Sequence, residues 1–229
     1  MKLPNIFIKG AIALPVIFLL AGCGGDTAVS TLSFPLGTAY KTIIADGWSK
    51  GFTVAGDCSG SGNRTVGPAS TPATFEGVTG LSAVTTFTMT LTNCTPAITN
   101  QTFTSYYDSS YVPLGIDSPG VNYGVYATPP TLPTTVKVGD TGPIGTMNLY
   151  TDSTKSIPNG TLVQSYVIEP NNSATAIVNL VSKNYDQSGT LVSTEQSRSR
   201  IDSAGTLTPV STDIQYANVS TTHLILTYY

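Results

Sequence analysis

Residues 174–216 read ATAIVNLVSKNYDQSGTLVSTEQSRSRIDSAGTLTPVSTDIQY and contain two turns of the same kind. Asp186-Gln187-Ser188-Gly189 and Asp202-Ser203-Ala204-Gly205 each place Asp first and Gly fourth, and each is followed by Thr-Leu. This order suits a type I turn that ends in a left-handed glycine, a common connection in β-hairpins. The two turns therefore predict three consecutive antiparallel strands.

Similar signals continue on both sides of this stretch. Pro158-Asn159-Gly160 and Glu169-Pro170-Asn171-Asn172 are further sequences made of residues that favour turns. The gaps between the turns have the length of strands, at 144–151, 161–169, 174–183, 190–200, 206–216 and 221–228. Because short connections join antiparallel neighbours, we predict an antiparallel β-meander over residues 134–229.

One of these predicted strands is unusually polar. Residues 190–200 include Glu195, Arg198 and Arg200 and have few apolar side chains after Val192. Two interpretations are open: an edge strand protected by its charges, or a strand that faces a polar groove or barrel lumen. The edge interpretation is preferred, because Pro209 in the next strand is also typical of a sheet edge.

The segment before the meander carries two cysteines, and the two parts are separated by a proline-rich stretch. Residues 128–133 contain three prolines, which favour an extended linker. In residues 33–127, β-like runs precede both Cys58 and Cys94. We therefore predict a β-sandwich-like domain pinned by a Cys58–Cys94 disulfide. An immunoglobulin topology is not assigned, because the single Trp48 does not lie between the cysteines.

The first 22 residues have the organisation of an export signal. Lys2 and Lys9 precede an uncharged apolar run, 11–20, which is too short to span a membrane as a helix. Leu20-Ala21-Gly22-Cys23 follows and resembles the lipobox of bacterial lipoproteins. The resemblance implies cleavage before Cys23, a diacylglyceryl thioether on its sulfur, and acylation of its amine by a chain such as palmitate.

The resemblance also implies a location. Gly24 and Gly25 follow the cysteine where an inner-membrane lipoprotein often has Asp, so an outer-membrane anchor in the cell envelope is expected, with the folded part facing either the periplasm or the exterior. Residues 23–32 are predicted to form a flexible tether. The membrane, through this lipid, is the expected partner.

Charge excludes one class of partner. Removal of Lys2 and Lys9 leaves eight basic residues against thirteen acidic ones, a net charge of −5. Nucleic acid requires basic surfaces, so no nucleic-acid partner is expected. Two cysteines without a nearby histidine, and a single histidine in the chain, indicate neither a zinc site nor another metal or cofactor.

One short motif has a possible catalytic meaning. Gly47-Trp48-Ser49-Lys50-Gly51 matches the G-x-S-x-G elbow of serine hydrolases, and His223 lies downstream. The elbow needs a helix after the serine, whereas Phe52-Thr53-Val54 indicates a strand. Ser49 and His223 therefore remain weak catalytic candidates, and no enzymatic activity is predicted.

The last candidate site is a group of tyrosines. Five of them lie within 21 residues: Tyr106, Tyr107, Tyr111, Tyr123 and Tyr126. Exposed tyrosines can contact glycans or proteins through a flat apolar ring and a polar tip. The sequence thus predicts a lipid-anchored envelope protein with a structural or interaction role. The alternative is a lipoprotein that binds a ligand or glycan, and a serine hydrolase comes third.

Overall fold

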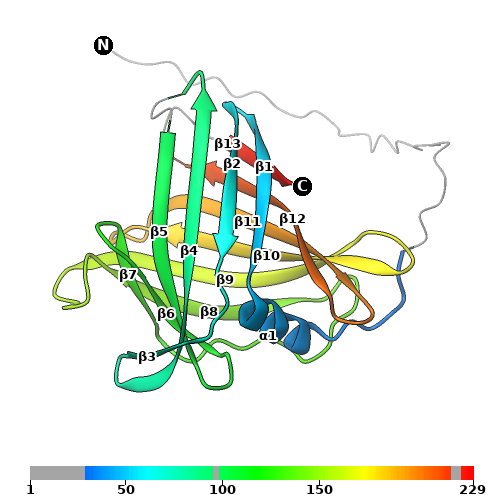
Figure 1. Cartoon of the computed structure of the whole chain (residues 1–229), viewed down its shortest axis with the longest axis horizontal. Coiled ribbons are helices and arrows are strands. Elements are labelled where there is room, and N and C mark those ends of the chain that lie inside the picture. The colour runs from blue at the N-terminus through cyan, green and yellow to red at the C-terminus, as the bar shows by residue number, and fades with distance from the viewer. Residues whose placement is uncertain (1–28, 95–97, 218–222) are drawn as a thin grey trace, which may run out of the picture.

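The computed structural model describes residues 29–94, 98–217 and 223–229. The signal sequence 1–22, Cys23 and most of the predicted tether lie outside the described residues. The fold consists of one helix and thirteen strands (Figure 1). The helix is α1, Leu36–Asp46. The strands are β1 (Trp48–Gly56), β2 (Ser59–Val66), β3 (Thr71–Phe75), β4 (Val78–Thr92), β5 (Ile98–Asp108), β6 (Pro113–Ser118), β7 (Asn122–Tyr126), β8 (Thr141–Tyr150), β9 (Pro158–Pro170), β10 (Thr175–Tyr185), β11 (Leu191–Asp202), β12 (Leu207–Tyr216) and β13 (His223–Tyr228).

Twelve of the strands form a closed antiparallel barrel. From β4 to β13 each strand pairs with the next along the chain, β13 pairs with β1, β1 with β2, and β2 with β4. The short strand β3 pairs with β4 alone and lies outside this ring. The chain is therefore an up-and-down meander whose first and last strands meet.

The all-β prediction and the Cys58–Cys94 disulfide are confirmed, but the division into a sandwich-like part and a separate meander is wrong, because the strands form one barrel. All six strands predicted after residue 134 are present, as β8 to β13. The strands of residues 33–127 belong to the same sheet instead of packing as a second one. The predicted linker 128–133 runs between β7 and β8, where the Thr131 amide donates to the Ile144 carbonyl at 2.9 Å.

The predicted turns have the expected backbone. Gly189 and Gly205 have φ angles of 81° and 85°, in the region that favours glycine. The carboxylates of Asp186 and Asp202 accept backbone N–H groups two and four residues ahead. The hydrogen bond from Ser188 Oγ, followed by the backbone bond from Thr190, lowers the pKa of Asp186, and the backbone bond from Thr206 is the largest effect that lowers the pKa of Asp202. Each Asp thus fixes one hairpin of the barrel.

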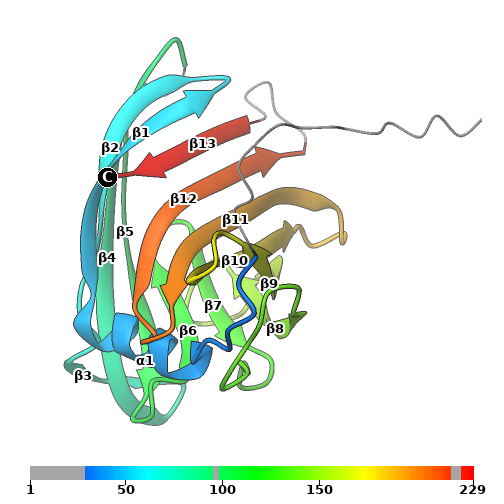
Figure 2. The same cartoon turned by 90° about the vertical axis from the view of Figure 1, so that its right-hand side faces the viewer.

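Helix α1 lies across one end of the barrel (Figure 2). Its buried residues Leu36, Ala39 and Ile44 face the barrel, where Leu36 and Ala39 join a cluster with Phe34 and Ile168. The opposite end carries the predicted disulfide between Cys58 and Cys94, whose Cα atoms are 5.9 Å apart. The barrel interior lies between these two ends.

The polar strand β11 is not an edge strand, so the preferred interpretation of residues 190–200 is wrong. It lies between β10 and β12 in the ring. Glu195 faces the interior. Gln196 and Arg198, one and three residues further on, lie on the outer face, where the Arg198 guanidinium donates a hydrogen bond to the Gln196 side chain. Pro209 lies where the register of β11 and β12 shifts, opposite Ser199. The lumen alternative accounts for the polar side chains.

Candidate ligand-binding cavity

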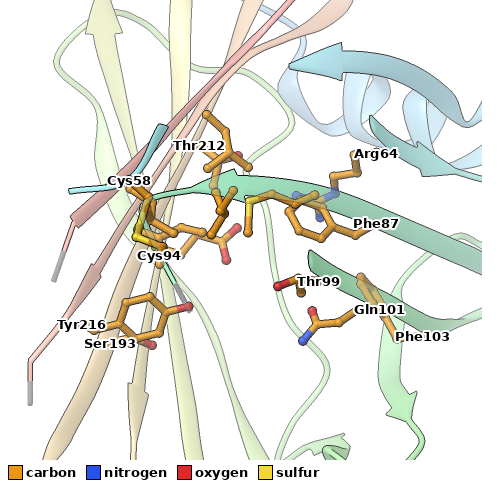
Figure 3. A pocket seen from close by; sticks show the side chains of 16 residues that line it. Cys58, Arg64, Phe87, Cys94, Thr99, Gln101, Phe103, Ser193, Thr212 and Tyr216 are labelled. Carbon is orange, nitrogen blue, oxygen red and sulfur yellow. A yellow bond between two sulfur atoms is a disulfide. The ribbon is translucent and has the colours of Figure 1, made fainter. Parts of the chain in front are cut away.

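A cavity of about 560 Å³ occupies the half of the barrel that ends at the disulfide (Figure 3). Ligand sites for small molecules typically have about 300–1,000 Å³. Two further hollows, of about 270 and 420 Å³, continue the space toward α1. All three share Arg64 and Glu195 in their walls, so these two residues stand at the centre of one connected interior.

One wall of the cavity is apolar. Strand β4 contributes three inward side chains at alternate positions, as the two-residue period of a strand requires. Strands β12 and β13 contribute the others, and together they belong to one buried cluster. The apolar side chains of this wall are Phe87, Met89, Leu91, Ile214, Leu224 and Leu226.

The remaining wall is polar. Strand β5 contributes Thr99, Gln101 and one aromatic ring, Phe103, and β11 contributes Ser193 and Glu195. Deeper in the barrel, Gln164 and Ser182 of β9 and β10 continue the same surface, and the Gln164 amide donates to Ser182 Oγ at 3.3 Å. An interior with one apolar and one polar wall can accommodate a molecule that has both polar and apolar parts.

Arg64 is the positive charge of the cavity. Its place in β2 sets it opposite Phe87 of β4, and Figure 3 shows the two side chains beside each other. The guanidinium carbon lies 5.6 Å from the ring centroid of Trp48, within the range of a cation–π contact. The Arg64 Nε atom is buried and has no hydrogen-bond partner among the described residues. Because Nε is closed to solvent, a molecule entering the cavity would meet the other N–H groups of the guanidinium, which forms no ion pair among the described residues.

Glu195 is the negative charge of the cavity. Its carboxylate accepts a hydrogen bond from Ser197 Oγ at 2.8 Å. Burial, and to a lesser degree the charge of Glu195, raises the pKa of Tyr216, another cavity residue. Among the described residues no ion pair joins Arg64 to Glu195. The two opposite charges therefore face the cavity without neutralising each other by contact.

The end of the interior at α1 is lined by tyrosines. Tyr40 of α1, Tyr107 of β5 and Tyr126 of β7 line the hollow there, and the Tyr126 hydroxyl donates to the Gln164 side chain. Burial is the largest effect on all three and raises their pKa values, so the phenols stay protonated and neutral near neutral pH. This end can donate hydrogen bonds but adds no charge.

The five tyrosines predicted as one patch are divided between two faces of the barrel. Tyr107 and Tyr126 face the interior. Tyr106 and Tyr123 contact Phe75 of β3, at 4.4 and 5.2 Å between ring centroids. Tyr111 lies in the loop before β6, with a φ angle of 65°. Adjacent residues of a strand point to opposite faces, which is why a cluster in sequence does not become a cluster in space.

Ser49 and His223 lie far apart. The Asp57 amide donates to the His223 carbonyl at 2.9 Å, which places these two residues side by side at one end of β1 and β13. Ser49 is at the other end of β1, so about eight residues at ~3.3 Å, or roughly 26 Å, separate it from His223. Ser49 Oγ instead shares a 2.7 Å hydrogen bond with Thr65 Oγ1, and His223 Nε2 lies 3.0 Å from Asp213 Oδ1. These two residues do not form a catalytic pair.

Other site types receive little support from the described part of the chain. In residues 29–94, 98–217 and 223–229 no group of three His, Cys, Asp or Glu side chains is placed to hold a metal ion. Over the same residues no helix has the length and apolar character to cross a membrane.

No protein-family model, no curated protein and no solved structure matches this chain.

Arg64 and Glu195 were not among the residues predicted to form a site. Strand β2 reads Ser-Gly-Ser-Gly-Asn-Arg-Thr-Val, which has small or polar residues on both faces. Without an apolar face, the sequence does not tell which alternate set points inward. For Glu195 the signal was present, because the lumen alternative for residues 190–200 describes its position.

Proposed function

We propose that this chain is a lipid-anchored cell-envelope protein that binds a small amphipathic molecule inside its barrel. The observation that carries the proposal is the interior with one apolar and one polar wall. A purely structural role makes no use of the mixed lining of a cavity of about 560 Å³, whereas an amphipathic ligand would match both of its walls. The ligand-binding alternative is therefore favoured over the purely structural role.

The lipid anchor is part of the same proposal. The sequence Leu20-Ala21-Gly22-Cys23 supports it, and placement in the outer membrane is inferred from Gly24 and Gly25 after the cysteine. An anchored barrel would hold its ligand close to a membrane. The glycan alternative has weaker support, because the tyrosines that suggested it do not share one surface.

Binding is tested with the full chain carrying Cys23→Ser, so that neither the attached lipid nor detergent competes for the cavity. The probe is N-phenyl-1-naphthylamine, a neutral fluorophore that brightens in apolar surroundings. We expect a saturable rise in fluorescence with one site per chain. A signal that does not saturate, or none at all, would overturn the proposal.

A pair of adjacent residues in β11 provides the matched control. Ser193 lines the cavity, whereas Thr194 follows it and points to the outer face. Ser193→Phe should fill part of the cavity and weaken probe binding several-fold, and Thr194→Phe should leave binding unchanged. Equal effects of the two variants would place the probe outside the barrel.

The anchor is tested separately in cells. The parent chain should sediment with membranes, and Cys23→Ser should move to the soluble envelope fraction, because several acyl chains are needed for stable attachment and the variant carries none. Membrane retention of Cys23→Ser would remove the anchor from the proposal and leave the binding test unaffected.

A further inference from the structure

We infer that the ligand is a carboxylate amphiphile, held with its carboxylate at Arg64 and its apolar chain directed toward the Cys58–Cys94 end of the barrel. The inference rests on the proposed function and specifies the chemistry and the orientation of the molecule in the cavity.

Arg64 supplies the recognition of the carboxylate. Its guanidinium has a ring of Trp48 on one face, while its buried Nε–H lacks an acceptor. Stacking uses the face of a guanidinium and leaves the N–H groups on its edge for hydrogen bonds. Carboxylates match this edge with two parallel, charge-assisted bonds. An anionic head group would thus find a partner in a cavity-lining guanidinium that forms no ion pair among the described residues.

The apolar wall sets the direction of the chain. Phe87 lies level with Arg64 in the register, and Met89 and Leu91 follow at alternate positions toward the disulfide. Four residues of strand at ~3.3 Å give an apolar track of about 13 Å. Leu226 and Leu224 of β13 line the same space. On the other side of Arg64 the larger of the two hollows, about 420 Å³, has Tyr40, Tyr107 and Tyr126 in its wall. The track on β4 therefore places the apolar chain toward the disulfide.

Glu195 sets the charge that the ligand can carry. It lines the same cavity as Arg64, and these two are the charged residues of its described lining. A single carboxylate placed at Arg64 is attracted by the guanidinium and repelled by Glu195. This balance favours a monoanion over a dianion such as a phosphate monoester. It also predicts that neutralising Arg64 lowers the affinity for the carboxylate, whereas neutralising Glu195 raises it.

The test uses a pair of probes that differ only in charge: cis-parinaric acid and its methyl ester, whose polyene fluorescence rises on binding. The protein is the full chain with Cys23→Ser. We expect the acid to bind about tenfold more tightly than the ester. Arg64→Gln should remove that preference by weakening the acid about tenfold while changing the ester less than twofold.

Two further variants complete the design. Glu195→Gln should tighten the acid several-fold and leave the ester unchanged, because a like charge facing the cavity is removed. Arg200→Gln makes the same charge change as Arg64→Gln on the exposed outer face of β11, and it should alter neither probe. A variant with unchanged thermal unfolding reports on recognition and not on loss of fold.

The outcomes separate the two proposals. If neither probe binds the parent, the proposed function fails together with the inference. If both probes bind equally well and Arg64→Gln changes neither, the barrel binds amphiphiles but the carboxylate inference is overturned. If Arg64→Gln weakens acid and ester alike, or Glu195→Gln weakens the acid, Arg64 acts through structure and the inference is also overturned.

Discussion

At the scale of single residues, Phe52 shows how the barrel packs around a position without a side chain. The ring of Phe52 is fully buried on β1 and stacks on Phe87 of β4, at 5.3 Å between ring centroids. Strand β2 lies between these strands, and Gly62 occupies the crossing point. A Cβ atom at Gly62 would come within 2.4 Å of the Phe52 ring. Glycine is needed there because the ring crosses directly over the backbone.

Phe52→Ala should therefore be strongly destabilising. The substitution leaves a cavity beside Phe87 and removes an edge-on contact with Tyr228 at 5.8 Å, so we expect a loss of about 3–5 kcal/mol in the free energy of unfolding. Urea denaturation followed by circular dichroism measures it. The control is Thr53→Ala, the exposed neighbour on the outer face, with a change below about 0.5 kcal/mol. Similar values for both variants would contradict this account of the packing.

Residue types alone predicted the Cys58–Cys94 disulfide but not the inward position of Arg64. After Cys23 of the predicted lipobox is set aside, two cysteines remain in a chain that is predicted to be exported, so their pairing followed from counting. Arg64 could not be assigned in the same way. Its outer neighbours Asn63 and Thr65 are as polar as the inward positions of β2, and burial of a charge depends on strands far away in sequence.

At the scale of elements, β11 is explained by the width of the barrel. A flat sheet with one buried face requires apolar residues on that face, and this rule gave the wrong edge prediction for residues 190–200. A twelve-stranded ring encloses more space than apolar side chains fill, so Ser193, Glu195 and Ser197 can face inward. Helix α1 was not predicted, although its buried residues Leu36, Ala39 and Ile44 are spaced as on one helix face.

The tip of the β3–β4 hairpin is fixed to the outside of the barrel by one carboxylate. Glu76 accepts a hydrogen bond from the Tyr123 hydroxyl at 2.8 Å and forms an ion pair with Lys155 of the β8–β9 loop. The hydrogen bond from Lys155 is the largest effect on Glu76 and lowers its pKa below the ordinary value of 4.5. The charged form of Glu76 is thus favoured in the folded protein.

Glu76→Gln should lower stability in a manner that depends on pH. Because the folded pKa is depressed, the contribution of Glu76 is complete above pH 4.5, the ordinary value, and is lost as the pH falls through the folded pKa. At pH 7 we expect the variant to be less stable by about 0.2–1 kcal/mol, the range of exposed pairs. Thermal unfolding at pH 7 and pH 3 measures the difference, which should shrink at pH 3. A difference that grows at low pH would contradict the ion pair.

At the scale of the whole molecule, the ring of strands could not be read from the sequence. Nearly every pairing joins neighbours along the chain, and the turn sequences predicted these pairings for residues 134–229. The exceptions are β2 with β4, which skips β3, and β1 with β13, where Phe52 pairs with Tyr228. The two cysteines suggested a link between two layers, whereas they join adjacent loops at one end of the barrel, next to the Ser59–Thr92 pair of β2 and β4.

Removal of the disulfide should destabilise the barrel without changing its topology. The bond joins residues 36 positions apart, and the chain-entropy relation gives about 4 kcal/mol for a loop of this size. The double variant Cys58→Ser/Cys94→Ser should unfold at lower urea concentration and keep its β-sheet circular dichroism. Dithiothreitol should shift the parent to the same midpoint and have no effect on the variant. An unchanged midpoint for the variant would show that the bond adds nothing to stability.

The pairing of β1 with β13 also determines when the barrel can close. The ribosome synthesises β1 first and β13 last, so β1 stays without this partner until all the residues between the two strands have been made. Contacts between such distant residues are slow to form. A chain interrupted before residue 223 would have two unpaired strand edges, which are prone to aggregate. For cellular quality control, an open ring with unpaired strand edges therefore distinguishes an incomplete chain from a finished one.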